Sequence, residues 1–429
     1  MITMKKISLK FIMAITLFGL LSSCNANAND NKGTKDFEAT QIVEQMQFGW
    51  NLGNTLDATG GSWARGLSTE TAWGQPKTTK PMIDGLAKSG IKTIRIPISW
   101  HDHIIDKNYT IDPAWMARVK QIVDWAYENE LFIIINTHHD NYDKNAPIPA
   151  GSGYYYPSQE NYEESSNYLK ALWTQICETF NNDYDYHLIF ETMNEPRPCG
   201  TDYEWWHDPN SIFSKKFMGA LNKLNQDVVD TIRKSGGNNK YRMIMVPALA
   251  ASPDAATTMD FIMPKDTVEN RLAVSVHMYT PYNFAMASPG DIKFTDAHKK
   301  DLTRVFSKLN RRFVSKGIPV VVGEMGATNK DNLQDRIAWF DYFVTEGRKN
   351  GIMTCCLWDN GVWKINKGEK ESSRYSEHYG YYNRNEQTWF FPELHQTAIK
   401  AMKKWNYLSL ENVIHKRFKN FILRYTRII

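Results

Sequence analysis

Two glutamates carry the clearest chemical signal in the sequence. Glu195 lies in Thr-Met-Asn-Glu-Pro at residues 192–196, and Glu324 lies in Val-Val-Gly-Glu-Met-Gly at residues 321–326. Each closes a short apolar run that is typical of a buried strand. In one parallel sheet the carboxyl ends of both strands share a rim, which would bring the two side chains together. A carboxylic acid that protonates a leaving oxygen, with a carboxylate that attacks or stabilises an anomeric carbon, suffices to cleave a glycosidic bond.

Other polar and aromatic residues close similar runs. They are Asn51, Arg95, His138, His139, Asn194, His277, Tyr279 and Trp358. Because side chains alternate along a strand, His138 rather than His139 is expected to face inward, although a bulge would reverse this choice. Any one of these residues could have a purely structural role, such as a salt bridge from Arg95 to a loop. Together they would be costly to desolvate without reciprocal hydrogen bonds, so their number favours a ligand site.

Eight strand-like segments alternate with helical segments, which predicts an α/β fold with a parallel sheet. A single (β/α)8 TIM barrel over residues 37–405 fits eight units best. An open doubly wound sheet would need a glycine-rich phosphate loop, and residues 49–54 do not match one. The expected strands are 48–52, 93–99, 132–138, 187–194, 242–247, 272–279, 319–324 and 353–359, and the expected helices include 113–130, 162–180, 212–235, 296–316 and 333–350.

The charge and the aromatic content limit the class of molecule that the protein can bind. The chain of 429 residues has a formal net charge of +4, and Lys5, Lys6 and Lys10 account for three of these charges. The remainder is nearly neutral, which predicts no binding of nucleic acid and fits a neutral substrate. Eight aromatic residues in loop-like segments are expected to stack on sugar rings or to pack under their own loops. These are Trp63, Trp73, Tyr154, Tyr155, Tyr156, Trp205, Trp206 and Trp363.

The N-terminus has the pattern of an export signal. Residues 1–23 combine a basic start, an apolar stretch from Phe11 to Leu21 and small residues before Cys24. Leu-Ser-Ser-Cys resembles the lipobox of bacterial lipoproteins, which implies lipidation of Cys24 and attachment to a membrane. A conventional secretory signal is the alternative. If Cys24 is lipidated, residues 24–36 would be a flexible tether, and the protein would lie at the outer membrane, a periplasmic face or the cell surface.

The remaining features carry no assigned chemistry. Residues 406–429 form a basic C-terminal tail that could be a surface helix, a contact with anionic lipid or a loosely ordered appendage. Cys177, Cys199, Cys355 and Cys356 show no spacing typical of a metal site and are expected to be small core residues. His138, His139 and Asp140 do not form a recognisable metal motif either. We expect no metal, no cofactor and a monomer.

The motifs resemble glycoside hydrolase family 5. Arg-Ile-Pro at 95–97, Asn-Glu-Pro at 194–196, His-x-Tyr at 277–279, Gly-Glu at 323–324 and Trp358 stand at the matching strand ends. Residues 49–57, 70–79 and 358–361 resemble the endo-β-1,4-glucanase branch, and the likeness runs from about Phe37 to Trp405. The resemblance implies a retaining enzyme with Glu195 as general acid/base and Glu324 as nucleophile.

The resemblance also implies roles for the neighbours. Arg95 and Tyr279 would keep Glu324 ionised. Asn194 would donate a hydrogen bond to the sugar 2-hydroxyl. Trp358 would form the floor of the subsite on the non-reducing side of the cleaved bond. His138 and His277 would bind hydroxyls or orient the carboxylates. We expect the charge of Glu324 to raise the pKa of Glu195.

The expected substrates are β-glucans such as cellulose, xyloglucan or mixed-linkage glucan. The loops 141–160 and 197–210 are expected to select among them. The alternatives are a β-mannanase or xylanase with the same machinery, or a non-catalytic surface glycan-binding lipoprotein. The last should have lost Glu195, Glu324 or Asn194, and all three are present.

Overall fold

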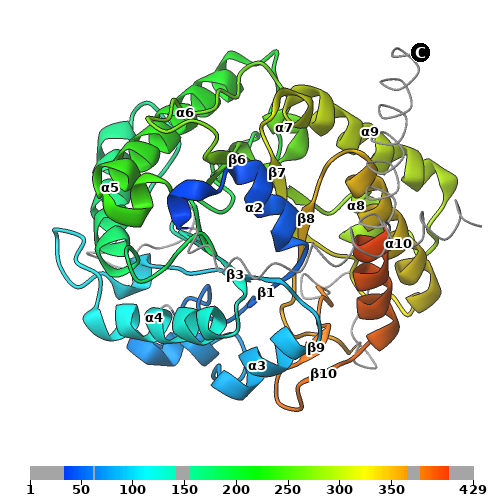
Figure 1. The fold of residues 1–429 in the computed structure, drawn as a ribbon. Coiled ribbons are helices and arrows are strands. Elements are labelled where there is room, and N and C mark those ends of the chain that lie inside the picture. Colours follow the sequence, from blue (N-terminus) through cyan, green and yellow to red (C-terminus); the bar gives the residue numbers. More distant parts are fainter. Residues whose placement is uncertain (1–32, 61–62, 142–153, 365–376, 405–429) are drawn as a thin grey trace, which may run out of the picture. The chain divides into compact units, whose positions relative to one another are not determined.

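Eight parallel strands close into a barrel in the order β1 to β8, and β8 pairs with β1 (Figure 1). The computed structural model describes residues 33–60, 63–141, 154–364 and 377–404. All eight predicted strands are confirmed. Their bounds are β1 Phe48–Asn51, β2 Thr93–Ile96, β3 Phe132–Asn136, β4 Leu188–Glu191, β5 Ile244–Pro247, β6 Leu272–Met278, β7 Val320–Met325 and β8 Thr354–Leu357.

Helices surround the barrel, and the five predicted ones are confirmed. After β1, β2, β3, β4, β6 and β7 the chain forms α3 Lys80–Lys88, α4 Pro113–Glu128, α5 Tyr162–Thr179, α6 Ile212–Lys234, α9 Asp296–Arg312 and α10 Leu333–Lys349. A helix over residues 392–404 follows β8. Between β5 and β6, a fully described stretch, the helical elements are the 3₁₀ turn η6 Leu249–Ala251 and the four-residue α7 Pro253–Ala256. None of the described helices combines the length and apolar character needed to cross a bilayer.

Polar caps explain where several helices begin. Asp112 accepts a hydrogen bond from the amide of Ala114 at the start of α4, and Pro113 takes the first helical position, where no amide proton is needed. Ser211 and Thr295 cap α6 and α9 in the same way. These caps start the helices after loops that lie at the C-terminal rim of the strands.

The shorter elements are mostly in the loops. They are α2 Ala39–Met46 before β1, α8 Tyr282–Ala285 after β6, the hairpin of β9 Tyr382–Asn383 and β10 Thr388–Trp389, and the 3₁₀ turns η2 Thr34–Asp36, η3 Gly66–Thr71, η4 His101–His103, η5 Gly237–Lys240 and η7 Val314–Lys316.

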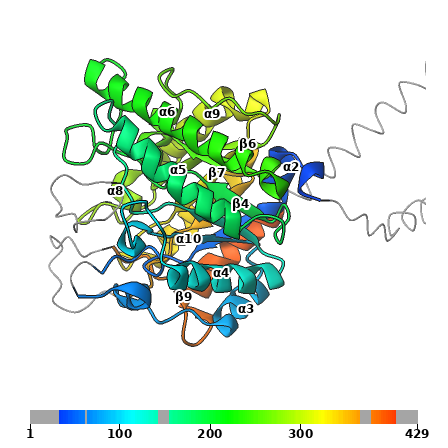
Figure 2. The same ribbon diagram turned by 90° about the vertical axis from the view of Figure 1, so that its left-hand side faces the viewer.

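The barrel interior is apolar at one end and polar at the other. At the N-terminal end, Ile42, Val43 and Met46 of α2 pack against inward-facing Ile134 and Met245, which seals the barrel. Figure 2 shows α2 at this end and α8 at the opposite end. Outward-facing strand residues such as Ile94 pack under the surrounding helices. The apolar seal leaves the C-terminal rim as the open end, where α/β barrels place their sites.

The cysteine prediction is confirmed, and one boundary prediction is wrong. Cys177, Cys199, Cys355 and Cys356 are buried, and the adjacent pair point to opposite faces of β8. The last three residues of the expected tether instead form η2, because Arg271 donates to the carbonyl of Lys35 at 2.7 Å. The predictions for residues 1–32, including Cys24, and for residues 405–429 lie outside the described residues.

Candidate active site

A bulge in β7 aims Glu324 into the barrel. The pairing of β6 with β7 runs Ser275 to Val321, then shifts so that His277 pairs with Glu324. Gly323 is the extra residue, and a β-carbon there would face His277 at 3.3 Å. Strict alternation from inward-facing Val321 would have turned Glu324 outward, so the bulge reverses the direction of this side chain.

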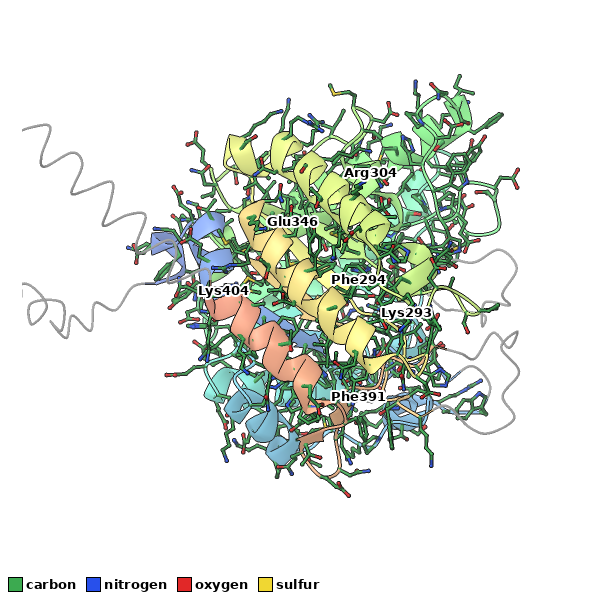
Figure 3. All side chains as sticks on the ribbon, turned by 90° about the vertical axis from the view of Figure 1, so that its right-hand side faces the viewer. Lys293, Phe294, Arg304, Glu346, Phe391 and Lys404 are labelled. Atoms are coloured by element: carbon green, nitrogen blue, oxygen red, sulfur yellow. The ribbon has the colours of Figure 1, made fainter. Side chains whose placement is uncertain are left out.

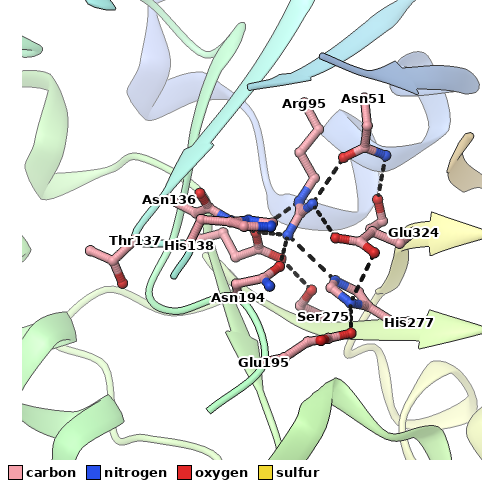
Figure 4. Close-up of polar contacts among 12 residues, drawn as sticks. Asn51, Arg95, Asn136, Thr137, His138, Asn194, Glu195, Ser275, His277 and Glu324 are labelled. Atoms are coloured by element: carbon pink, nitrogen blue, oxygen red, sulfur yellow. Dashed lines mark hydrogen bonds and ion pairs between the residues drawn. The ribbon is translucent and has the colours of Figure 1, made fainter. Parts of the chain in front are cut away.

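Arg95 is the hub of the polar interior (Figure 4). Its side chain is fully buried, and its guanidinium donates to Glu191 through Nε at 2.9 Å. Nη1 donates to Asn51 and to Glu324, both at 2.9 Å, and Nη2 donates to Asn194 at 2.6 Å. Burial alone would lower the pKa of Arg95, but the charges of Glu191 and Glu324 raise it above its ordinary value. The guanidinium therefore remains charged and orients three side chains at the rim.

Glu191 is a site residue that the strand-end reasoning missed. It is fully buried inside the barrel, where Asn136 donates to Oε2 at 2.9 Å and Ser275 donates to Oε1 at 2.5 Å. Its ion pair with Arg95 measures 2.8 Å. The available signal was a charged residue in the apolar run Leu-Ile-Phe-Glu, since a carboxylate inside a sheet needs a cation.

Glu195 and Glu324 lie close together beyond the ends of β4 and within β7. His277 Nδ1 lies 2.7 Å from Glu195 Oε1 and 3.6 Å from Glu324 Oε2. An oxygen of each glutamate lies within 4.8 Å of the other. This separation fits the roughly 5–5.5 Å of carboxyl pairs in retaining glycosidases and is shorter than the roughly 6.5–9.5 Å of inverting ones. Tyr279 donates from its hydroxyl to Glu324 Oε2 at 2.8 Å, as its expected role requires.

The proton of the Glu195–His277 pair is held on His277 in the ligand-free site. Burial raises the pKa of Glu195, but the hydrogen bond and charge of His277 and the charge of Arg197 outweigh it and hold that pKa below its ordinary value. Burial lowers the pKa of His277, but the charges of Glu324 and Glu195 raise it above its ordinary value. The expectation of a raised pKa for Glu195 is therefore wrong for this state. That expectation took Glu324 as the group that sets the pKa of Glu195, whereas His277 contacts Glu195 directly.

Four of the other predicted residues, His138, His139, Asn194 and Trp358, line one cleft of about 820 Å³. Both His138 and His139 line it, so the choice between them was unnecessary. His138 lies parallel to Trp358 with ring centroids 6.0 Å apart, and burial holds its pKa well below the ordinary value. Because Arg95 holds the oxygen of the Asn194 side chain, the amide nitrogen is available to the cleft. Asn51 lies deeper and donates to the carbonyl of Gly323 at 3.0 Å, which ties β1 to the bulge.

The loop aromatics were only partly understood from the sequence. Trp205 lines the cleft, and the Arg197 guanidinium lies 4.2 Å from its ring centroid. Trp73 lies beside His139, with ring centroids 5.4 Å apart. Tyr155 and Tyr156 are instead buried, and Trp363 stacks on Phe390. Tyr156 donates from its hydroxyl to the carbonyl of Cys199 at 3.1 Å, so it is held inside the protein rather than placed against a sugar.

Glu377 is a further cleft residue that the sequence reasoning missed. It lines the cleft, and burial raises its pKa, with further contributions from the charges of Glu195 and Glu324. It follows a segment rich in charged and polar residues, so nothing in its local pattern indicated a site.

Among the residues that the structure describes, two groups have the donor types of a metal site. They are Glu195 with His277 and Glu324, and Asp57 with His138 and His139. In the second group both Asp57 oxygens accept backbone amides, from Thr55 at 2.7 Å and Asn54 at 3.0 Å. In the first, each carboxylate already accepts a side-chain hydrogen bond. That no metal is used remains a prediction.

Comparison with known proteins agrees with this geometry. The profile of "Cellulase (glycosyl hydrolase family 5)" matches residues 56–363. The chain belongs to glycoside hydrolase family 5.

Known relatives and solved structures match most of the chain. Endoglucanase A of Clostridium longisporum is 41% identical over 85% of this chain, which spans 66% of that relative's length. A lichenase from Caldicellulosiruptor sp. F32, solved as a mutant with cellotetraose, is 42% identical with a TM-score of 0.78, over 85% of this chain and 96% of that one. A broad specificity endoglucanase from Ruminococcus champanellensis, with bound cellotriose, is 38% identical with a TM-score of 0.76, over 85% and 99%. The chain is therefore a glycoside hydrolase.

Substitution of Arg95 tests the hub. In Arg95→Lys the charge remains but the fork that contacts four side chains is lost, so kcat should fall by about 100-fold or more through misplacement of the rim. Arg95→Met should lower the free energy of unfolding by about 3–5 kcal/mol, because two buried carboxylates lose their cation. Steady-state kinetics and chemical denaturation measure the two effects. Arg118→Lys is the control, since Arg118 is a buried arginine paired with Glu70. Equal losses in both lysine variants would contradict the hub role.

Substitution of His277 tests where the proton is stored. In the native pair the proton is lost as pH rises through the raised pKa of His277, which sets the alkaline limb of kcat/KM. In His277→Gln the proton resides on Glu195 alone, so this limb should move to lower pH. The pH profile of kcat/KM measures the shift, with His187→Gln as a control for a histidine paired elsewhere. An unchanged alkaline limb in His277→Gln would show that another group supplies the proton.

Proposed function

We propose that the protein is a retaining endo-β-1,4-glucanase that hydrolyses internal bonds of β-glucans. The observation that carries this proposal is the pair Glu195 and Glu324, with oxygens within 4.8 Å, at the open rim of a family 5 barrel. The cleft that holds the pair is open and lined by aromatic and polar side chains, as a polymer threaded past the site requires. Bound cello-oligosaccharides in related structures support glucose units as the ligand.

The first step is attack by Glu324 on the anomeric carbon. Arg95 and Tyr279 each donate a hydrogen bond to one Glu324 oxygen, which aims the carboxylate. His277 Nδ1 passes its proton to Glu195 over 2.7 Å, and Glu195 gives that proton to the leaving oxygen as the bond to the anomeric carbon breaks. The products of this step are a shortened glucan and a glycosyl ester on Glu324.

The second step releases the ester. Glu195, now ionised, takes a proton from water, and the water oxygen attacks the same anomeric carbon while Glu324 departs as a carboxylate. Two inversions give net retention. The Asn194 amide nitrogen, left available by Arg95, donates to the 2-hydroxyl of the sugar in both transition states.

Variants of the two glutamates separate their roles. Glu324→Ala and Glu195→Ala should each lose at least about 10³-fold of kcat on mixed-linkage β-glucan, with the fold intact by circular dichroism. With an activated β-glucoside and azide, Glu324→Ala should yield the α-glycosyl azide, because azide replaces the carboxylate. Glu195→Ala should yield the β-glycosyl azide, because azide replaces water in the second step. The opposite azide configurations would show that Glu195 is the nucleophile and Glu324 the acid/base. Full activity in both variants would contradict the proposal.

A substrate panel tests the polymer class. Reducing ends released from purified cellulose, xyloglucan, mixed-linkage glucan, mannan and xylan should appear from the glucans. Release mainly from mannan or xylan would make the protein a β-mannanase or a xylanase.

We further propose that residues 1–23 are a lipoprotein signal peptide and that acylated Cys24 anchors the enzyme at a membrane surface. The Leu-Ser-Ser-Cys sequence at the end of the apolar stretch supports this. Cys24→Ser should move the full-length protein from the membrane fraction to the soluble fraction in its bacterial host, measured by fractionation and immunoblotting. Equal membrane association of both forms would rule out this anchor.

A further inference from the structure

Helix α9 carries an unusual concentration of positive charge. The segment from Asp296 to Lys316 contains seven cations but only two acids, whereas the whole chain has 51 Lys and Arg against 47 Asp and Glu. The cations are Lys299, Lys300, Arg304, Lys308, Arg311, Arg312 and Lys316. Arg304 lies on the outer face of this helix (Figure 3). Because the rest of the protein is nearly neutral, this face is where an anion would be attracted.

A hollow of about 660 Å³ runs along this face. Five cations line it, and Asp254 is its one acid. Asp254 is shared by Arg304 at 3.2 Å and Lys308 at 2.9 Å. For Arg311 and Lys316 the described part of the chain offers no ion pair, and both are exposed. The hollow therefore has more positive charge than its own acid can balance.

The hollow continues the catalytic cleft. Asp254 and Arg304 line both, so the two surfaces meet at α7 and the first half of α9. A polymer that passes Glu195 and Glu324 and follows the cleft to this end would come to lie against α9. A neutral glucan gains nothing from Arg311 and Lys316, whereas a carboxylate on the chain would form charge-assisted hydrogen bonds with them.

We propose that this basic groove, defined by Arg304, Lys308, Arg311, Arg312 and Lys316, binds carboxylate-bearing sugar residues of a polysaccharide whose neutral part occupies the cleft. The ligand class is an acidic polysaccharide with uronate-type groups. Continuity with a cleft for sugars favours this ligand over nucleic acid or anionic lipid. The proposal rests on the proposed function for the occupant of the cleft.

Binding to an acidic polymer that lacks β-1,4-glucosidic bonds tests the groove apart from catalysis. Arg311→Gln/Lys316→Gln should weaken retardation in gels containing polygalacturonate by about three- to tenfold at low salt, as expected for two exposed cations. The difference should shrink at high salt. Lys215→Gln/Lys216→Gln, which removes two exposed charges from α6, is the matched control and should bind like the native protein. Equal retardation of the native protein and Arg311→Gln/Lys316→Gln would overturn the proposal.

Kinetics connect the groove to the cleft. Arg311→Gln/Lys316→Gln should raise KM about three- to tenfold on carboxymethyl cellulose with kcat unchanged. On neutral hydroxyethyl cellulose neither constant should change. Equal changes on both polymers would overturn the proposal. Binding to phosphatidylglycerol vesicles or RNA that depends on α9, without binding to polygalacturonate, would also overturn it. If the protein binds polygalacturonate but cleaves neither carboxymethyl cellulose nor hydroxyethyl cellulose, the proposed glucanase function is wrong, whereas the binding role of the groove stands.

Discussion

The buried guanidinium of Arg95 is the constraint on which the rest of the site depends. A cation inside a barrel is tolerable only with anions and hydrogen-bond acceptors around it. Arg95 obtains Asn51 from β1, Glu324 from β7, and Glu191 and Asn194 from β4 and the segment after it. Glu191 in turn requires Asn136 and Ser275. One charge therefore fixes the inward residues of most strands, while α2 seals the opposite end with apolar side chains.

The charge balance of this network explains the protonation of the site. Arg95 offers one positive charge against the negative charges of Glu191 and Glu324, so the interior has an excess of negative charge before Glu195 is considered. A proton shared by Glu195 and His277 keeps that pair neutral overall. Loss of this proton would place a third uncompensated carboxylate within 4.8 Å of Glu324. The proton needed by the leaving group is therefore retained by the negative charge of this network.

Much of the fold could be predicted from the sequence, because buried strands and amphipathic helices alternate with clear periods. The rim residues were also predictable, since polar groups that end apolar runs share one end of a barrel. Glu191 was missed because it lies inside a run rather than at its end. The direction of Glu324 depends on a bulge at Gly323, which follows from pairing between β6 and β7 rather than from any local pattern. The pKa of Glu195 depends on the position of His277, 82 residues away in the chain.

The mechanism requires Glu324, held by Arg95, to form the covalent bond to sugar. Incubation with an activated 2-deoxy-2-fluoro cellobioside, followed by peptide mapping with mass spectrometry, tests it most directly, because the fluorine slows breakdown of the ester. The mechanism predicts one fluorosugar per protein molecule, attached to Glu324, and no label in Glu324→Gln. A label on Glu195 or Glu191, or an unlabelled enzyme that releases products of inverted configuration, would contradict it.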